Sequence, residues 1–451
     1  MNDTEMTRRR FLERTGAAAL GVGLAAKGLT ASGLSQPTPT SSRRQVGANE
    51  KIVLGVIGCA GMGSANMKAL WNYPEIEVAA LCDVDSNRIG SDFKAVEDKF
   101  KKKPDVYGDY RRMLERKDID AIIIGSPDHW HALQLIHSVE AGKDVYCEKP
   151  ISYSIVEAVS MAGAARRFKR VVQVGTWQRS TKEFSDAINY VKSGKLGKIV
   201  LCRAWITDSF RAGRQKVQPV PAGLDYDMWI GPAQMVPYKP NHVHWNWRWF
   251  NNTGGGMTTD WGVHMMDIAL LGMSQGQDLV MPVEVSAHGG QWAILDDDRT
   301  AYDTTEALLR FKNPDFVMHW SVRRDTPGLP GHGTEFVSAD GKTLRVWRGG
   351  WVILGPDGKE IPKEEGPAPG NHWRNFVDCV KSRQMPVADL ASVAQTTIVC
   401  HLVNASQFSG QTVRWDKQRM DLVGREGRST IAYDRPYRRP YSLKKYAWLG
   451  F

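Results

Sequence analysis

The segment Ile52-Val-Leu-Gly-Val-Ile57-Gly58-Cys-Ala60-Gly61-Met62-Gly63 joins a short apolar run to a glycine-rich turn. The apolar run is typical of a buried strand, and the residues that follow have helical spacing. Glycines at a strand–helix junction permit a tight turn, close approach of a pyrophosphate and close packing of the helix. Ala60 takes the middle position of the G-x-G-x-x-G fingerprint. We therefore expect a dinucleotide to be bound by Gly58, Ala60, Gly61, Met62 and Gly63.

Apolar runs and helically spaced segments continue to alternate as far as residue 174. Further strands are predicted at 78–82, 121–124, 145–147 and 171–174, with helices at 64–71, 88–100, 130–141 and 155–168. Short β-runs separated by helices are typical of a parallel, doubly wound sheet. The predicted fold class is therefore α/β, with a Rossmann domain over residues 47–176.

Asp83 ends the second predicted strand, 20 residues after Gly63. A carboxylate at this position can accept hydrogen bonds from the adenosine ribose and would repel a 2′-phosphate. The spacing therefore favours NAD over NADP as cofactor. Two alternatives remain open at this point: Arg88 would favour NADP if it folded toward the ribose, and Asp83 would otherwise be a turn residue at a strand end.

Two more motifs follow the strands predicted at 121–124 and 145–147. The first reads Gly125-Ser126-Pro127-Asp128-His129-Trp130-His131, and the second ends in Glu148-Lys149-Pro150. They resemble the Pro-Asn/Asp-x-x-His turn and the Glu-Lys-Pro motif of the Gfo/Idh/MocA family, named for glucose–fructose oxidoreductase, inositol dehydrogenase and a rhizopine catabolism protein. A third motif at residues 254–267 also matches, so the resemblance extends over roughly residues 51–410.

The resemblance implies which further residues contact the cofactor. From the two motifs these are Ser126, Pro127, Asp128, His131, Glu148 and Lys149. It adds Gln178 and Arg179, which follow the strand at 171–174, and Trp247 and Arg248, which precede the triple glycine of the third motif.

The third motif places Asp260, His264 and Asp267 at i, i+4 and i+7. In one continuous helix this spacing puts all three on the same face. A carboxylate one turn from an imidazole can orient it and favour its protonated form. The resemblance implies that His264 accepts the proton of a substrate hydroxyl while hydride leaves the same carbon, that Lys149 bonds the reacting oxygen, and that Asp260 positions the substrate or His264. A core histidine is the alternative interpretation.

No metal site is predicted. His242, His244 and His264 are not spaced like a standard zinc ligand set. The six cysteines are scattered, which indicates neither a zinc site nor a disulfide framework.

From residue 177 the predicted elements change in kind. A helix at 182–192 and a strand at 199–205 precede a long irregular stretch, and strands follow at 307–311, 317–322, 335–338 and 343–347. Helices at 373–383 and 390–406 close this substrate domain, residues 177–410. The resemblance implies an α+β domain with a large, mostly antiparallel open sheet, whose free face often mediates oligomer contacts; we expect a homodimer or homotetramer.

Four of the 16 tryptophans, Trp245, Trp247, Trp249 and Trp261, cluster around the third motif. Aromatic faces stack well on the apolar faces of sugar rings. Core packing explains most tryptophans, but we expect at least one of these four to face the substrate. With the resemblance, this favours a sugar, cyclitol or glycoside as substrate.

The net charge of +10 on 451 residues first suggests an anionic partner such as nucleic acid or a membrane. However, +3 lies in residues 1–50 and +6 in residues 411–451, so the body between them is nearly neutral. We therefore expect no nucleic-acid partner, and a neutral body suits an uncharged sugar. The basic, aromatic tail over residues 411–451 covers part of the core, wraps another subunit or remains solvated.

The N-terminus resembles a twin-arginine export signal. Thr7-Arg8-Arg9-Arg10-Phe11-Leu12 precedes a Gly/Ala-rich run at 16–26 and a Pro/Ser/Thr-rich linker at 35–42. Residues 1–46 are therefore expected to direct a folded, cofactor-loaded protein through the twin-arginine translocase to the periplasm. An amphipathic starting helix is the alternative.

Three functions remain open. The leading hypothesis is an exported NAD-dependent oxidoreductase with a tightly bound cofactor, acting on a secondary hydroxyl of a carbohydrate. The second is an NAD-dependent glycosidase that oxidises C3 transiently, eliminates the aglycone, adds water and reduces the ketone again. The third is a non-catalytic binding protein, against which the joint presence of Lys149, Asp260 and His264 argues.

Overall fold

The computed structural model describes residues 47, 50–276, 278–323 and 330–450. The expected export signal and linker, residues 1–46, lie outside the described residues. Of the helices that are described, none is both long enough and apolar enough to cross a membrane.

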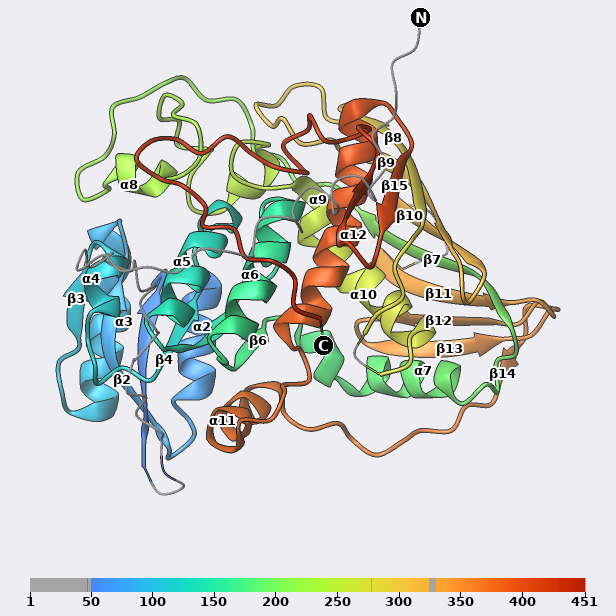
Figure 1. The fold of residues 1–451 in the computed structure, drawn as a ribbon, viewed down its shortest axis with the longest axis horizontal. Coiled ribbons are helices and arrows are strands. Elements are labelled where there is room, and N and C mark those ends of the chain that lie inside the picture. The colour runs from blue at the N-terminus through green and yellow to red at the C-terminus, as the bar shows by residue number, and fades with distance from the viewer. Residues whose placement is uncertain (1–46, 48–49, 277, 324–329, 451) are drawn as a thin grey trace, which may run out of the picture. The chain divides into compact units, whose positions relative to one another are not determined.

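A parallel six-stranded sheet forms the first half of the described chain, in the order β3-β2-β1-β4-β5-β6. Its strands are β1 (Ile52–Ile57), β2 (Ile76–Cys82), β3 (Asp105–Tyr107), β4 (Ala121–Ile124), β5 (Asp144–Cys147) and β6 (Val172–Val174). Helices α2 (Gly61–Leu70), α3 (Ser86–Phe100), α4 (Tyr110–Leu114), α5 (Asp128–Glu140) and α6 (Ile155–Arg167) connect them (Figure 1). The predicted doubly wound Rossmann sheet is confirmed.

Local chemistry explains where these helices begin. Asp85 caps α3 by accepting the Asn87 N–H, and Ser154 caps α6 by accepting the Glu157 N–H. The Glu157 carboxylate in turn accepts the Tyr153 N–H at 2.8 Å. Strand β3 and helix α4 were not predicted, because β3 is a short and largely exposed edge strand without an apolar run.

The second half is built on a ten-stranded sheet in the order β14-β13-β12-β11-β7-β10-β9-β8-β15-β16. Its strands are β7 (Ile199–Thr207), β8 (Glu284–Gly290), β9 (Thr304–Phe311), β10 (Phe316–Arg323), β11 (His332–Ser338), β12 (Thr343–Trp347), β13 (Gly350–Leu354), β14 (Glu360–Ile361), β15 (Val413–Asp416) and β16 (Asp421–Val423). Only β7 and β10 pair in parallel, so the sheet is mostly antiparallel, as predicted.

The remaining helices follow the Rossmann sheet in the chain. They are η1 (Trp177–Ser180), α7 (Lys182–Lys192), α8 (Tyr226–Ile230), η2 (Asn246–Trp249), α9 (Gly256–Asp260), α10 (Gly262–Met273), α11 (His372–Ser382) and α12 (Leu390–Ser409). The amphipathic helix α11 was expected to close the substrate domain. Instead its apolar face, with Phe376 and Val377, joins the core formed by β1, β2 and α2.

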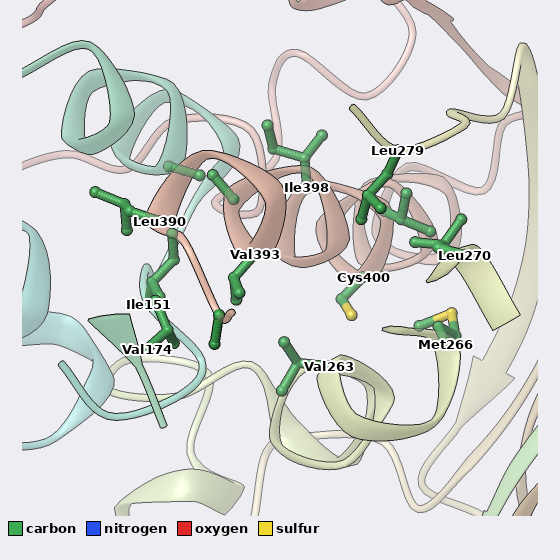
Figure 2. Packing of buried hydrophobic residues seen from close by; sticks show 14 of the residues in the cluster. Ile151, Val174, Val263, Met266, Leu270, Leu279, Leu390, Val393, Ile398 and Cys400 are labelled. Carbon is green, nitrogen blue, oxygen red and sulfur yellow. The ribbon is translucent and has the colours of Figure 1, made fainter. Parts of the chain in front are cut away.

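The long helix α12 is apolar on nearly every side and lies at the centre of the main hydrophobic core. Figure 2 shows Val393 and Cys400 of α12 among residues of α10, such as Val263, and residues of the first half, such as Val174. Both sheets therefore share one core, which places the carboxyl ends of the Rossmann strands against α9 and α10.

The basic C-terminal segment covers part of the core. Strands β15 and β16 extend the second sheet, and the later residues run along α5, α6 and α8 (Figure 1). Arg435 is buried and forms a 2.7 Å ion pair with Glu157 of α6. The Tyr441 ring packs edge-on against Trp130 of α5 at 5.3 Å. Of the three arrangements expected for the tail, packing on the core is the one that this chain shows.

Candidate active site

A cavity of about 640 Å³ lies at the carboxyl ends of the Rossmann strands and is lined by residues of both halves. This volume is typical of a small-molecule site, and the location is the usual ligand position in doubly wound sheets. Predicted residues in its wall are Gly58, Ala60, Gly61, Met62, Asp83, Ser126, Pro127, Glu148, Lys149, Trp247, Arg248, Asp260 and His264. Trp245, Trp249 and Trp261 line it as well.

The glycine-rich turn forms an open cradle at one end of this cavity. Gly58 has φ +86°, and a Cβ there would lie 2.8 Å from the backbone of Gly125. A Cβ on Gly63 would overlap the Gly58 carbonyl oxygen, so Gly63 permits the close packing of α2 and does not line the cavity. Gly61, with φ +50°, has open space where a side chain would be. The turn therefore fits a pyrophosphate close to backbone N–H groups at the start of α2.

Asp83 lies in the cavity wall beside this cradle. Its carboxylate accepts the Cys59 N–H at 2.8 Å and the Asp85 N–H at 3.0 Å. Burial raises the pKa of Asp83 above its ordinary value, although these two hydrogen bonds oppose the shift. Asp83 therefore ties the glycine-rich turn to the end of β2 while its side chain borders the cavity.

The loop after β4 divides its residues between the cavity and the interior. Ser126 and Pro127 line the cavity, but Asp128 and His131 lie behind its wall. The ring nitrogens of His131 lie 2.8 Å from the Pro150 carbonyl oxygen and 2.7 Å from that of Ser126. Asp128 and His131, which were expected to contact the cofactor, therefore do not line the cavity, because the first turn of α5 buries both. His131 instead joins the two loops that do line the cavity.

Gln178 and Arg179 are also placed differently from the prediction. Both are buried in η1 and neither lines the cavity. Arg179 binds the Asp267 carboxylate through two N–H···O bonds of 2.8 Å and 2.6 Å, and it donates to Ser392 Oγ at 2.7 Å. Arg179 therefore connects η1 with α10 and α12, and the ion pair with Asp267 keeps it away from the cofactor site.

Glu148 and Lys149 follow β5 into the cavity. Glu148 is buried and accepts a 2.7 Å hydrogen bond from Asn66 of α2. A Cβ on Gly175 would lie 2.6 Å from this carboxylate, so only glycine fits there. Lys149 Nζ donates to the Asp260 carbonyl oxygen at 2.8 Å and to Asp260 Oδ1 at 2.9 Å.

Asp260 is the carboxylate shared by two cations of the cavity. Besides Lys149, Arg248 donates to Asp260 Oδ1 through Nε at 3.3 Å. Burial by itself would raise the pKa of Asp260, but the charges and hydrogen bonds of Lys149 and Arg248 outweigh it and lower that pKa. Arg248 stacks over the rings of Trp247 at 4.2 Å and Trp245 at 4.6 Å. Asp260 is therefore a charged anchor for Lys149 and Arg248.

The expected single helical face is wrong. Helix α9 ends at Asp260 and α10 begins at Gly262, so Asp260 and His264 belong to different helices. The carbonyl of Asp260 accepts Lys149 Nζ, and the His264 N–H donates to the Trp261 carbonyl instead. The break therefore coincides with the contact between Lys149 and the Asp260 carbonyl.

His264 lies in the first turn of α10 with its ring in the cavity wall. Its Nδ1 is buried and has no hydrogen-bond partner among the described residues. Burial, followed by the positive charges of Lys149 and Arg348, holds the pKa of His264 well below its ordinary value. The expected stabilisation of the protonated imidazole by Asp260 is therefore wrong, because the surroundings of His264 favour its neutral form.

The structure adds cavity residues that the sequence did not reveal. Arg348 reaches the cavity from the turn between β12 and β13, and Trp177, Phe210 and Trp229 also line it. Arg348 precedes Gly349-Gly350, which in sequence resembles any solvent-exposed hairpin. His244 also lines the cavity, and its Nε2 lies 3.2 Å from Asp85 Oδ2 at the N-terminus of α3. In the part of the chain that the structure describes, no cluster of His, Cys, Asp and Glu is arranged to hold a metal ion.

Comparisons with known proteins agree with this geometry. A family model described as the oxidoreductase family with an NAD-binding Rossmann fold matches residues 52–176. A second, for the C-terminal alpha/beta domain of the same oxidoreductase family, matches residues 204–301. The first half is accordingly an NAD-binding Rossmann domain.

Curated relatives and solved structures point in the same direction. The uncharacterized oxidoreductase YrbE of Bacillus subtilis is 25% identical over 272 residues, covering 56% of this chain and 68% of YrbE. The alpha-N-acetylgalactosaminidase of Shewanella oneidensis is 27% identical over 202 residues, which is 43% of this chain and 44% of that protein. The chain thus matches less than half the length of the glycosidase. The WlbA dehydrogenase of Bordetella pertussis, solved with NADH and UDP-GlcNAcA, shares the fold with a TM-score of 0.63 at 16% identity, covering 81% of this chain and 99% of WlbA.

Proposed function

We propose that the chain, which matches Gfo/Idh/MocA oxidoreductase models over residues 52–176 and 204–301, is an exported NAD-dependent enzyme of that family that acts on a secondary hydroxyl of a sugar, cyclitol or glycoside. The observation that carries the proposal is the group Lys149, Asp260 and His264 in the wall of the dinucleotide cavity. A fixed ammonium and a neutral imidazole in one cavity are the groups that hydroxyl oxidation requires.

The residues present fit a dinucleotide. The pyrophosphate would bind at Gly58, Ala60 and Gly61, and the adenosine ribose at Asp83. We propose NAD over NADP because the Asp83 carboxylate borders the cavity. Arg88 also lines this end, but its Nε is 3.9 Å from Asp85 Oδ2, which draws it toward the N-terminus of α3.

When bound, the nicotinamide supplies the acceptor or donor of hydride. His264 accepts the hydroxyl proton, since its depressed pKa leaves the imidazole neutral. Lys149 donates a hydrogen bond to the reacting oxygen while Asp260 holds its ammonium in place. The tryptophans in the wall cover the sugar ring and exclude water.

A second candidate is a redox-neutral glycosidase. It is favoured by the similarity to the alpha-N-acetylgalactosaminidase, since transient oxidation and re-reduction would use the same lysine and histidine. Oxidation at C3 makes the neighbouring C–H acidic, so that the aglycone is eliminated before water is added and the ketone is reduced.

A glycoside panel separates these functions. We expect purified protein to change the nicotinamide redox state with at least one sugar, whereas released aglycone without net NADH would favour the glycosidase. Turnover unaffected by His264→Gln and Lys149→Met together would overturn both enzymatic proposals and leave a binding protein.

Export and tight cofactor binding complete the proposal. Free NAD is scarce outside the cytoplasm, so a folded protein exported through the twin-arginine translocase would have to carry its cofactor. The support is the Thr7–Leu12 sequence. Denaturing the purified protein should release about one nicotinamide dinucleotide per chain, and Arg8→Lys with Arg9→Lys should keep the protein in the cytoplasm. We also propose a homo-oligomer, which sedimentation would test.

A further inference from the structure

Arg348 brings a guanidinium to the end of the cavity that holds His264. Its guanidinium carbon lies 4.4 Å from the centre of the Trp261 ring and 4.7 Å from that of Trp177. The Trp261 ring also packs edge-on against His264, with 6.0 Å between ring centres. Arg348 is thus fixed in place by aromatic rings beside the proposed base.

Arg348 is half-buried, and it differs from the three buried arginines because no carboxylate in the described part of the chain is paired with it. Arg179, Arg299 and Arg435 pair with Asp267, Asp208 and Glu157 at 2.6, 2.7 and 2.7 Å, respectively. Among the described residues, by contrast, no carboxylate lies within the 4 Å ion-pair distance of Arg348, and its Nε is buried without a hydrogen-bond partner. A partly buried guanidinium without a paired carboxylate is costly, so a site that keeps one is expected to receive an anionic partner from a ligand.

Burial lowers the pKa of Arg348 and outweighs the attraction of two carboxylates, Asp260 and Glu183, which act on it from beyond ion-pair distance. Lys149 and Arg248 are both cations and share the single carboxylate of Asp260. Two other carboxyl groups, Glu148 and Asp128, are buried nearby, and burial raises the pKa of each. Although the chain body is nearly neutral in total, the end of the cavity that contains Arg348, Lys149 and Arg248 therefore carries a positive charge.

The arrangement of side chains around the Arg348 guanidinium indicates which kind of ligand it can bind. Two indole rings lie over the guanidinium, so the in-plane N–H edge is the part left for hydrogen bonding. That edge matches the two oxygens of a planar carboxylate, which arginine binds as a fork. We propose that the substrate is a carboxylate-bearing carbohydrate, such as a uronic acid or its glycoside, and that Arg348 binds the carboxylate while Lys149 and His264 act on a hydroxyl. This inference rests on the proposed function.

The experiment compares matched substrates on the cofactor-loaded protein. Methyl glucuronoside and methyl galacturonoside are set against methyl glucoside, methyl galactoside and the corresponding 6-phosphates. Turnover is followed by nicotinamide redox state and aglycone release, and binding by titration calorimetry. We expect kcat/KM for a uronoside to exceed that for its neutral counterpart by on the order of 10- to 100-fold, as a charge-assisted bond implies.

Three variants test whether Arg348 causes the preference for the uronoside. Arg348→Gln should remove the preference for the uronoside mainly through KM, and Arg348→Lys should restore only part of it, because lysine keeps the charge but loses the fork. Arg310→Gln, on the exposed face of β9, is the matched control and should leave the preference unchanged. Circular dichroism and Tm establish that each variant is folded.

The outcomes separate the two proposals. Activity on neutral sugars that equals or exceeds activity on uronosides, with an unchanged ratio in Arg348→Gln, overturns the carboxylate assignment and leaves the oxidoreductase proposal standing. A preference for 6-phosphates also overturns the assignment. Absence of both turnover and calorimetric binding for every sugar overturns the proposed function, and the inference falls with it.

Discussion

Lys149 Nζ lies 2.9 Å from Asp260 Oδ1, although the two residues are 111 positions apart in the chain. The same ammonium bonds the Asp260 carbonyl, and this contact coincides with the break between α9 and α10. The pair thus joins the Rossmann half to the helix that carries His264. One ion pair sets both the direction of the lysine and the position of the base.

Removing the lysine should abolish catalysis and weaken the fold. Lys149→Met should lower kcat by roughly 10²- to 10³-fold, the usual cost of losing a donor to a developing oxyanion. It also leaves Asp260 buried with Arg248 as its remaining cation, so Tm should fall. Adding Asp260→Asn should recover Tm but not kcat. Lys239→Met, at an ion pair outside the cavity, is the control; a Lys149→Met enzyme as active as this control would contradict the assignment.

The pH profile should report the depressed pKa of His264. Because burial and two cations hold that pKa well below its ordinary value, the base is already neutral above about pH 6.5. We expect kcat/KM to stay level as pH falls through 6.5 and to decrease only under more acidic conditions. His264→Gln should lower kcat by roughly 10²- to 10⁴-fold. A profile that breaks near pH 6.5 would show that the imidazole is not desolvated in the working enzyme.

Buried histidines should make the protein sensitive to acid. Burial lowers the pKa of His129 to about 3 and those of His131 and His401 to about 4. The unfolded chain takes up protons on these groups below about pH 6.5, whereas the folded chain does not, so the free energy of unfolding falls as pH falls from 6.5 toward 4. Urea midpoints measured between pH 7.5 and 4.5 test this. His401→Gln should reduce the slope, and an unchanged slope would count against burial as its cause.

Two glycines of the turn should respond differently to alanine. Gly61→Ala adds a side chain in open space at φ +50°, so we expect a loss of about 1–2 kcal/mol in stability and a clear loss of cofactor affinity. Gly63→Ala would overlap the Gly58 carbonyl oxygen and should displace α2, with a much larger fall in Tm. Thermal melts with and without added NAD distinguish the two. If Gly61→Ala retains full NAD affinity, the pyrophosphate does not bind at this cradle.

The C-terminal segment should contribute to stability through Arg435. Arg435→Met leaves Glu157 buried without its cation and should cost about 3–5 kcal/mol. Arg438→Met breaks an ion pair with the exposed Asp227 and should cost at most about 1 kcal/mol from that pair. Denaturant titration of the two variants gives the comparison. Equal and small losses would mean that the segment rests on the core without stabilising it.

The Rossmann sheet, the glycine-rich turn and most helix positions were predictable because strand and helix periodicity and turn chemistry are local properties of the chain. The same locality explains the errors. Spacing placed Asp260 and His264 on one helix, but α9 ends at Asp260 and α10 begins at Gly262, where the Asp260 carbonyl contacts Lys149 from a distant part of the chain. Likewise, Arg179 resembled a cofactor ligand until the structure showed it paired with Asp267.

Tertiary packing alone decided the electrostatics of the site. The residues next to Arg348 in the sequence do not indicate that it contacts Trp177 and Trp261. The three residues lie on separate elements, which meet only because the two sheets share their core. The summed charges indicated a nearly neutral chain body, because a sum contains no information about where each charge lies in the fold. The fold brings Arg348, Lys149 and Arg248 into the wall of one cavity, where Asp260 pairs with Lys149 and Arg248 but not with Arg348, and only the folded chain contains that information.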